Sequence, residues 1–174
     1  MLQNKTLDVN KKDSDGINSF WISCYFGHGR VMSVLAEAGC DVFNTDPKGN
    51  NVLHVAARRG GMKGYPSAGI ISMLIKSKFP LDEQNNRRET AVSIAAQRGN
   101  IGGLEVLINA GAKLDVLNKH DISALYLAIL NDQDEAVELL VKSGALVFCN
   151  QTNKQKDNSP IFLAIRKQRK KYIA

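Results

Sequence analysis

The seven residues Asn51-Val52-Leu53-His54-Val55-Ala56-Ala57 decide the fold of this 174-residue chain, because the segment around them recurs along the sequence. That segment, DPKGNNVLHVAARRG, begins at Asp46, and similar segments begin at Asp13, Asn85 and Asn118. Their starts are separated by 33, 39 and 33 residues, and a short further copy, NSPIFLAI, occupies residues 158–165. Self-similarity at a period of about 20–50 residues is typical of solenoids and other repeat arrays. The sequence therefore predicts one structural unit used several times.

Each unit has the pattern of two short helices. In the third unit Val92, Ala95 and Ala96 follow helical spacing, and Leu104, Leu107 and Ile108 repeat that spacing further along. Glycines follow the second helix, where a left-handed residue ends a helix most easily, at Gly39, Gly111 and Gly144. Residues suited to turns begin the units at Asp13, Asp46, Asn85 and Asn118. One helix pair cannot bury its apolar face alone, so neighbouring pairs must stack.

These segments resemble the ankyrin repeat, which opens with D-x-x-G-x-T-P-L-H-x-A-A-x-x-G-H and closes with L-L-x-x-G-A-x-V-N. The resemblance covers about nine tenths of the chain and implies an all-α, ankyrin-type solenoid of stacked helix-turn-helix repeats, with four full repeats plus partial units at both ends. The family's histidine is kept only as His54, which we expect inside a repeat junction. Its other positions hold Trp21, Ser93, Tyr126 and Phe162.

The repeat register predicts the organisation of the chain. The first 12 residues, 1–12, are the end of a preceding partial repeat. The four full repeats follow at residues 13–45, 46–84, 85–117 and 118–150, and the second of them contains a six-residue insertion. A truncated fifth repeat with a basic tail occupies residues 151–174. Neither end has the polar capping unit with which such arrays close, which favours a piece of a longer array or protein. We expect Ile161, Leu163, Ala164 and Ile165 to face water.

The inserted segment at residues 60–69 is rich in glycine, so we expect it to be non-helical. A glycine-rich loop can cradle a phosphate, but here no strand precedes it and no G-K-[ST] follows. The segment is interpreted as a surface loop.

The composition separates the body of the chain from its tail. The net charge of +6 comes entirely from residues 151–174, which hold seven basic side chains and one acidic one, while residues 1–150 are neutral. The body therefore lacks the basic surface of a polyanion-binding protein. Three scattered cysteines form no disulfide framework, and neither a signal peptide nor a membrane-spanning stretch of about 20 residues occurs. We expect a cytoplasmic or nuclear protein without membrane insertion.

No constellation of residues predicts catalysis, a metal site or a cofactor. His28, His54 and His120 lie at repeat positions rather than at ligand spacing with cysteines. Cys24 replaces an alanine of the packed pair, so burial is expected rather than reactivity. The sequence predicts no enzyme, no catalytic residue, no metal and no cofactor.

The resemblance implies a concave groove in which the two residues before each turn glycine face the partner. Carried over residue by residue, these positions give the partner-binding set Tyr25, Phe26, Arg58, Arg59, Gln97, Arg98, Asn131, Arg166 and Lys167. Leu130 lies beside Asn131 at the fourth of these places. The tips of the turns add Asp15, Lys48, Arg87 and His120. Aromatic residues and arginines commonly anchor interfaces. We therefore expect a protein partner with an apolar anchor and an acidic stretch. An alternative is that Tyr25 and Phe26 pack against further repeats of the same polypeptide.

Three function classes remain at this point. The leading one is a non-catalytic interaction scaffold or targeting module. The second is a regulatory segment of a larger enzyme or channel whose activity lies elsewhere. The weakest is polyanion binding by the basic run at residues 166–171, which also fits a nuclear-import signal or a solvated helix end. Nucleic acid is disfavoured as a partner because the body is neutral.

Overall fold

The computed structural model describes residues 8–60, 62–147 and 159–167. Those residues form nine α-helices and no strand, which confirms the all-α prediction. The helices are α1 Ser19–Tyr25, α2 Gly29–Glu37, α3 Val52–Arg59, α4 Ser67–Lys76, α5 Ala91–Arg98, α6 Ile101–Asn109, α7 Ala124–Leu130, α8 Asp134–Lys142 and α9 Pro160–Arg166.

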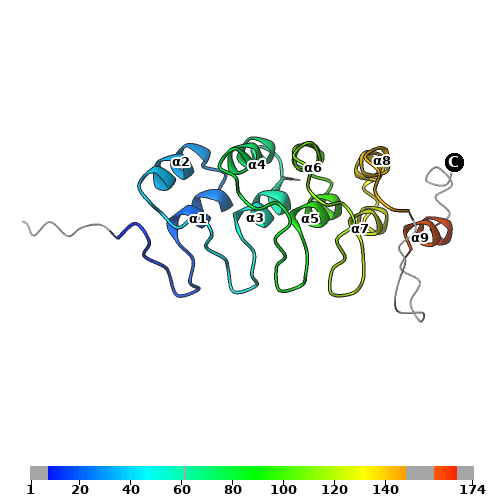
Figure 1. Cartoon of the computed structure of the whole chain (residues 1–174), viewed down its shortest axis with the longest axis horizontal. Helices are drawn as coiled ribbons and strands as arrows, with labels where there is room; N and C mark the ends of the chain where they lie inside the picture. The colour runs from blue at the N-terminus through cyan, green and yellow to red at the C-terminus, as the bar shows by residue number, and fades with distance from the viewer. Residues whose placement is uncertain (1–7, 61, 148–158, 168–174) are drawn as a thin grey trace, which may run out of the picture.

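The helices form two parallel rows (Figure 1). One row holds the first helix of each pair, α1, α3, α5, α7 and α9, and the other holds α2, α4, α6 and α8. Each first helix packs on the next one along the row, and each of the first four also packs on its own second helix. The expected solenoid of helix pairs is confirmed, while the exact unit boundaries stay a prediction.

The core runs between the two rows. The pairs Ala56-Ala57 and Ala95-Ala96 are fully buried, as are Leu104 and Leu107 on α6. Alanine at the contact between successive first helices lets their backbones approach closely, because interaxial distance depends on the side chains at the contact. One continuous apolar core therefore spans all the units.

The loops before the first helices repeat one hydrogen-bonding pattern. The Oδ1 atom of Asp46 accepts from the backbone N–H groups of Lys48 and Asn50 at 2.9 and 2.7 Å. Asp13, Asn85 and Asn118 accept equivalent pairs of bonds in their own loops, which confirms the predicted turn residues. Neighbouring loops are also joined, since Asn86 N–H donates to the Lys48 carbonyl at 3.0 Å.

His54 lies in the junction between two units, as predicted. Its Nε2 is 2.9 Å from the backbone carbonyl of Glu89, which can only accept, so Nε2 carries the hydrogen. Nδ1 lies 3.3 Å from the backbone nitrogen of Asn51, whose N–H donates to it, and 2.6 Å from Asn51 Oδ1. Burial is the main cause that lowers the pKa of His54 below its usual value, because a charged imidazolium loses its hydration there.

Asn100 fastens three helices together. Its amide nitrogen donates to the Ala57 carbonyl at 3.0 Å, and its Oδ1 accepts from Ser67 Oγ at 2.8 Å and from Gly103 N–H at 3.0 Å. A Cβ at residue 60 or 103 would collide with this side chain, so glycine is required at both positions. The end of α3, the start of α4 and the start of α6 are held at one point.

Two expectations about the chain's irregular parts were wrong. The last three residues of the insertion are helical, because α4 begins at Ser67 and includes Gly69. In the last described unit, Leu163 and Ala164 do not face water. They are buried because α9 packs on α7, which leaves Phe162 and Ile165 exposed on the outer side.

Candidate functional site

The predicted partner-binding residues lie at corresponding places on consecutive first helices. All of them belong to what we call the first-helix face, meaning the surface of α1, α3, α5, α7 and α9 with the loops that precede these helices. Tyr25 ends α1 and Phe26 caps it, while Arg58 and Arg59 end α3. Gln97 and Arg98 end α5, Asn131 caps α7, Arg166 ends α9 and Lys167 caps it.

An aromatic group occupies the α1 end of this face. The rings of Trp21 and Tyr25 stack with centroids 5.6 Å apart, and Phe26 meets the Tyr25 ring edge-on at 5.2 Å. Phe26 is 60% exposed, so much of this apolar surface is open to a partner. Aromatic side chains with one open face are typical anchors of protein interfaces.

Arg59 joins that aromatic group to α3. Its guanidinium carbon lies 4.0 Å from the centroid of the Tyr25 ring and 5.5 Å from that of Tyr65. The Nε atom is buried and has no hydrogen-bond partner among the described residues. The Tyr65 hydroxyl is held in turn, since it donates to the Cys24 carbonyl at 2.6 Å. Arg59 is thus fixed in position without an acceptor for its buried N–H.

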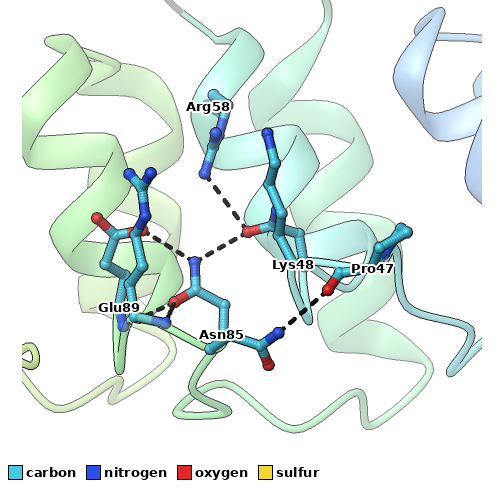
Figure 2. A pocket seen from close by; sticks show the side chains of 8 residues that line it. Pro47, Lys48, Arg58, Asn85 and Glu89 are labelled. Atoms are coloured by element: carbon cyan, nitrogen blue, oxygen red, sulfur yellow. Dashed lines mark hydrogen bonds between the residues drawn. The ribbon is translucent and has the colours of Figure 1, made fainter.

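A polar hollow of about 190 Å³ lies between the loops before α3 and α5 (Figure 2). Asn50 is one of its lining residues, and its Oδ1 accepts from Asn85 Nδ2 at 2.9 Å and from Arg58 Nη2 at 3.4 Å. Asn85 Nδ2 also donates to Glu89 Oε2 at 2.9 Å. Lys48 and Arg87 complete the cationic part of the lining. The hollow therefore presents three cations and one carboxylate.

At the C-terminal end of the first-helix face, around α7 and α9, the polar side chains bind the chain's own backbone. Lys167 Nζ donates to the carbonyls of Ile129 and Leu130 at 3.1 and 2.7 Å, and lies 2.9 Å from Asp132 Oδ1. Asn131 Nδ2 donates to the Leu127 carbonyl at 2.8 Å. Both side chains satisfy the last carbonyls of α7, a place where cations also meet the negative end of the helix dipole. Their polar groups are engaged inside the chain, whereas the buried Nε of Arg59 on α3 has no such partner among the described residues.

Several residues of the face were not in the predicted set. Trp21, Asn50 and Glu89 line its hollows, and Tyr65 supports Arg59. The repeated loop pattern could have pointed to Asn50, since each loop closes four residues after its Asp or Asn. Tyr65 gave no signal, because it comes from the insertion and has no counterpart in other repeats. The basic run beyond Lys167 lies outside the described residues.

The groups examined for reactivity are held in unreactive settings. Burial is the main cause that raises the pKa of the Cys24 thiol to about 12, which keeps it protonated. Burial also raises the pKa of Tyr65, and the neighbouring Cys24 adds to this. Across the described parts of the chain, no three side chains of the metal-binding types gather into a site. None of the described helices has the length and apolar character needed to cross a membrane.

Comparison with known proteins identifies the repeats. The family model described as ankyrin repeats (3 copies) matches residues 62–153 and 94–173. The chain is 29% identical over 135 residues to the E3 ubiquitin-protein ligase XBAT33 of Arabidopsis thaliana, which covers 77% of this chain and 24% of that protein. It is 26% identical over 143 residues to the potassium channel AKT2/3 of the same plant, which covers 82% of this chain and 17% of the channel. Against human neurogenic locus notch homolog protein 1 it is 26% identical over 156 residues, covering 89% of this chain and 6% of that protein. The chain thus spans a quarter or less of each of these relatives.

Proposed function

The chain belongs to the ankyrin-repeat family, and from that premise we propose that it is a non-catalytic module that binds another protein on its first-helix face. The partner lays an apolar side chain against Tyr25 and Phe26 and an acidic stretch along Arg58, Arg59 and Arg98. Gln97, Asn131, Arg166 and Lys167 complete the proposed surface, the last two at its far end.

One observation carries this proposal. The guanidinium carbon of Arg59 lies 4.0 Å from the centroid of the exposed Tyr25 ring, Arg58 lines the same hollow, and neither arginine is in an ion pair with any described carboxylate. Arginine offers a planar fork that matches carboxylates, and it is among the residues enriched at the energetic centres of interfaces. A fixed, unneutralised arginine next to an open aromatic surface is suited to an acidic partner.

A second candidate function is a regulatory segment of a larger enzyme or channel. It is favoured by the relatives, which include an E3 ubiquitin-protein ligase and a potassium channel of which the chain spans only 24% and 17%. In that case the face binds another part of the same protein, and catalysis or conduction resides elsewhere. The buried free thiols of Cys24 and Cys40 suit the reducing cytoplasm or nucleus for either function.

The test reverses charge on the face. A partner is first captured with the intact chain, and its dissociation constant is then measured with an Arg58→Glu, Arg59→Glu double variant. We expect affinity to fall by at least about a hundredfold, because like charges placed opposite each other at an interface cost several kcal/mol. Arg58→Glu alone, which leaves the Arg59 stack on Tyr25 intact, should give part of this loss.

The matched control reverses two lysines on the other row. Lys76 ends α4 and Lys142 ends α8, and Lys142 lies 3.7 Å from Glu138 in a well-exposed pair of little energetic value. Lys76→Glu, Lys142→Glu should leave affinity within about twofold, since surface pairs of this kind contribute ~1 kcal/mol or less. Equal losses from both double variants, with melting temperatures unchanged, would show that the face is wrongly assigned.

A further inference from the structure

Two hollows adjoin on the first-helix face and share a wall. One, of about 110 Å³, lies between α1 and α3 and is lined by Trp21, Tyr25 and Arg59. The other is the 190 Å³ hollow between the loops before α3 and α5 (Figure 2). Both are also lined by Lys48, Asn50 and Arg58. A ligand that fills both hollows must therefore cross the loop that carries Lys48.

The two carboxylates that line these hollows, Asp46 and Glu89, already accept hydrogen bonds from neighbouring groups. Asp46 accepts from two backbone N–H groups through Oδ1, and its Oδ2 accepts from Asn50 Nδ2 at 2.8 Å. Glu89 Oε2 accepts from Asn85 Nδ2. Four cationic side chains, Lys48, Arg58, Arg59 and Arg87, thus share two carboxylates that are bound to amides. Each hollow has room for one further anionic group.

We propose that the two hollows each take one carboxylate of an extended acidic peptide, and that the two acidic residues are three positions apart. Successive first helices lie about 8–10 Å apart when packed. A polyproline-II segment has three residues per turn and a rise of about 3.1 Å, so side chains three apart lie on one side at about 9 Å. Arg59 then meets the first carboxylate, and Arg58 with Arg87 meets the second. The inference rests on the proposed binding face and adds the sequence preference of its partner.

A peptide fits these hollows better than a nucleic acid does. Binding to a nucleic acid gains its strength from many phosphate contacts and the release of counterions. Here the cations form one compact group on a body of zero net charge over residues 1–150. The two carboxylates in the linings also oppose a continuous phosphate backbone.

The test follows the Nε–Hε signals of Arg58 and Arg59 by NMR in the ¹⁵N-labelled full chain. Three blocked glycine-serine decapeptides serve as probes: one with two glutamates three apart, one with the same glutamates adjacent, and one with glutamines three apart. The first should shift both signals and bind about tenfold more tightly than the second, because only it can place a charge-assisted hydrogen bond in each hollow. The glutamine peptide should bind too weakly to measure.

Two variants separate the hollows from general charge. Arg58→Gln should abolish the preference for the spaced glutamates while leaving the Arg59 signal responsive, whereas Lys76→Gln should change neither. Equal affinity for both glutamate peptides, shifts confined to other residues, or no binding by either peptide overturns the inference. Stronger shifts from an oligothymidine of matched charge overturn it in favour of nucleic acid. If the double charge reversal still weakens the natural partner, only the spacing rule fails and the proposed function stands.

Discussion

The central α5–α6 unit and the N-terminal α1–α2 unit share one repeat pattern but differ in burial. Ile94 on α5 is 2% exposed, whereas Ile22, its counterpart on α1, is 40% exposed. Leu107 on α6 is fully buried, but Leu35 on α2 is only partly buried. Val9, Ile17, Ile22 and Leu35 instead line an open hollow of about 370 Å³. Burial of these positions is thus conferred by the unit stacked before them, not by the unit's own sequence.

The two units also differ in how their second helices begin. Asn100 caps α6 and bonds to three helices, while His28 precedes α2 without a capping side-chain bond. The central unit is therefore fixed by both apolar contact and polar bonds, and the N-terminal unit by less of either. Substitutions at matched positions of the two units should show how much apolar burial and polar hydrogen bonds each contribute to the stability of the fold.

The largest difference is expected at the paired leucines. Leu107→Ala should lower the free energy of unfolding by about 2–5 kcal/mol, because it leaves a cavity in a close-packed core. Leu35→Ala should cost less than half of that, since part of the side chain is already in water. Denaturant unfolding followed by circular dichroism measures both. Equal losses would mean that stacking does not govern burial at this position.

A smaller difference is expected at the helix starts. Asn100→Ala should cost about 1–3 kcal/mol, because the Ala57 carbonyl and the Ser67 hydroxyl lose a partner in the interior. His28→Ala should change stability by less than about 0.5 kcal/mol, as most surface substitutions do. The same unfolding experiment applies. A neutral Asn100 variant would indicate that water replaces its three bonds.

The smallest effect is a dependence on pH at one junction. The folded pKa of His54 is below 6.5, so below that pH the unfolded chain binds more protons than the folded one. Stability should be complete above pH 6.5 and fall toward lower pH, by at most about 1.4 kcal/mol per pH unit until the folded pKa is reached. His54→Gln should remove this dependence. Trp21, at the matching position of the N-terminal unit, cannot titrate, and a Trp21→Phe variant should retain the full slope.

What the sequence predicted correctly depends on patterns inside one unit. The helix spacing, the turn residues such as Asp46, and the left-handed Gly39 and Gly111 all recur with the repeat. Arg88 and Asp121 adopt a positive φ where the loops of the first two units have glycine, and both loops keep the repeated hydrogen-bonding pattern. These features need no knowledge of neighbours.

What the sequence did not predict depends on contacts between units. Leu163 was expected in water because its own unit is short, but it is buried where α9 packs on α7. Arg59 was assigned to an open surface, yet a ring from the preceding unit and another from the insertion hold it. Lys167 was assigned to the partner-binding set, and no pattern in the sequence indicated that it also donates to the last carbonyls of α7. A repeat register predicts where a side chain lies in its own unit, but it does not predict which groups of the neighbouring units that side chain contacts.

The Asn100 side chain bears on how this chain can be extended in the laboratory. It bonds to the Ala57 carbonyl and the Ser67 hydroxyl, which lie on either side of the loop between α3 and α4. The residues at both ends of the loop are therefore held by Asn100, which lies outside the loop, while Met62, Lys63 and Gly64 are exposed. Lengthening an exposed loop costs little free energy, since each doubling adds only about 0.6 kcal/mol of closure entropy. An epitope or fluorophore-binding tag placed between Lys63 and Gly64 would report on the array without altering its stacking.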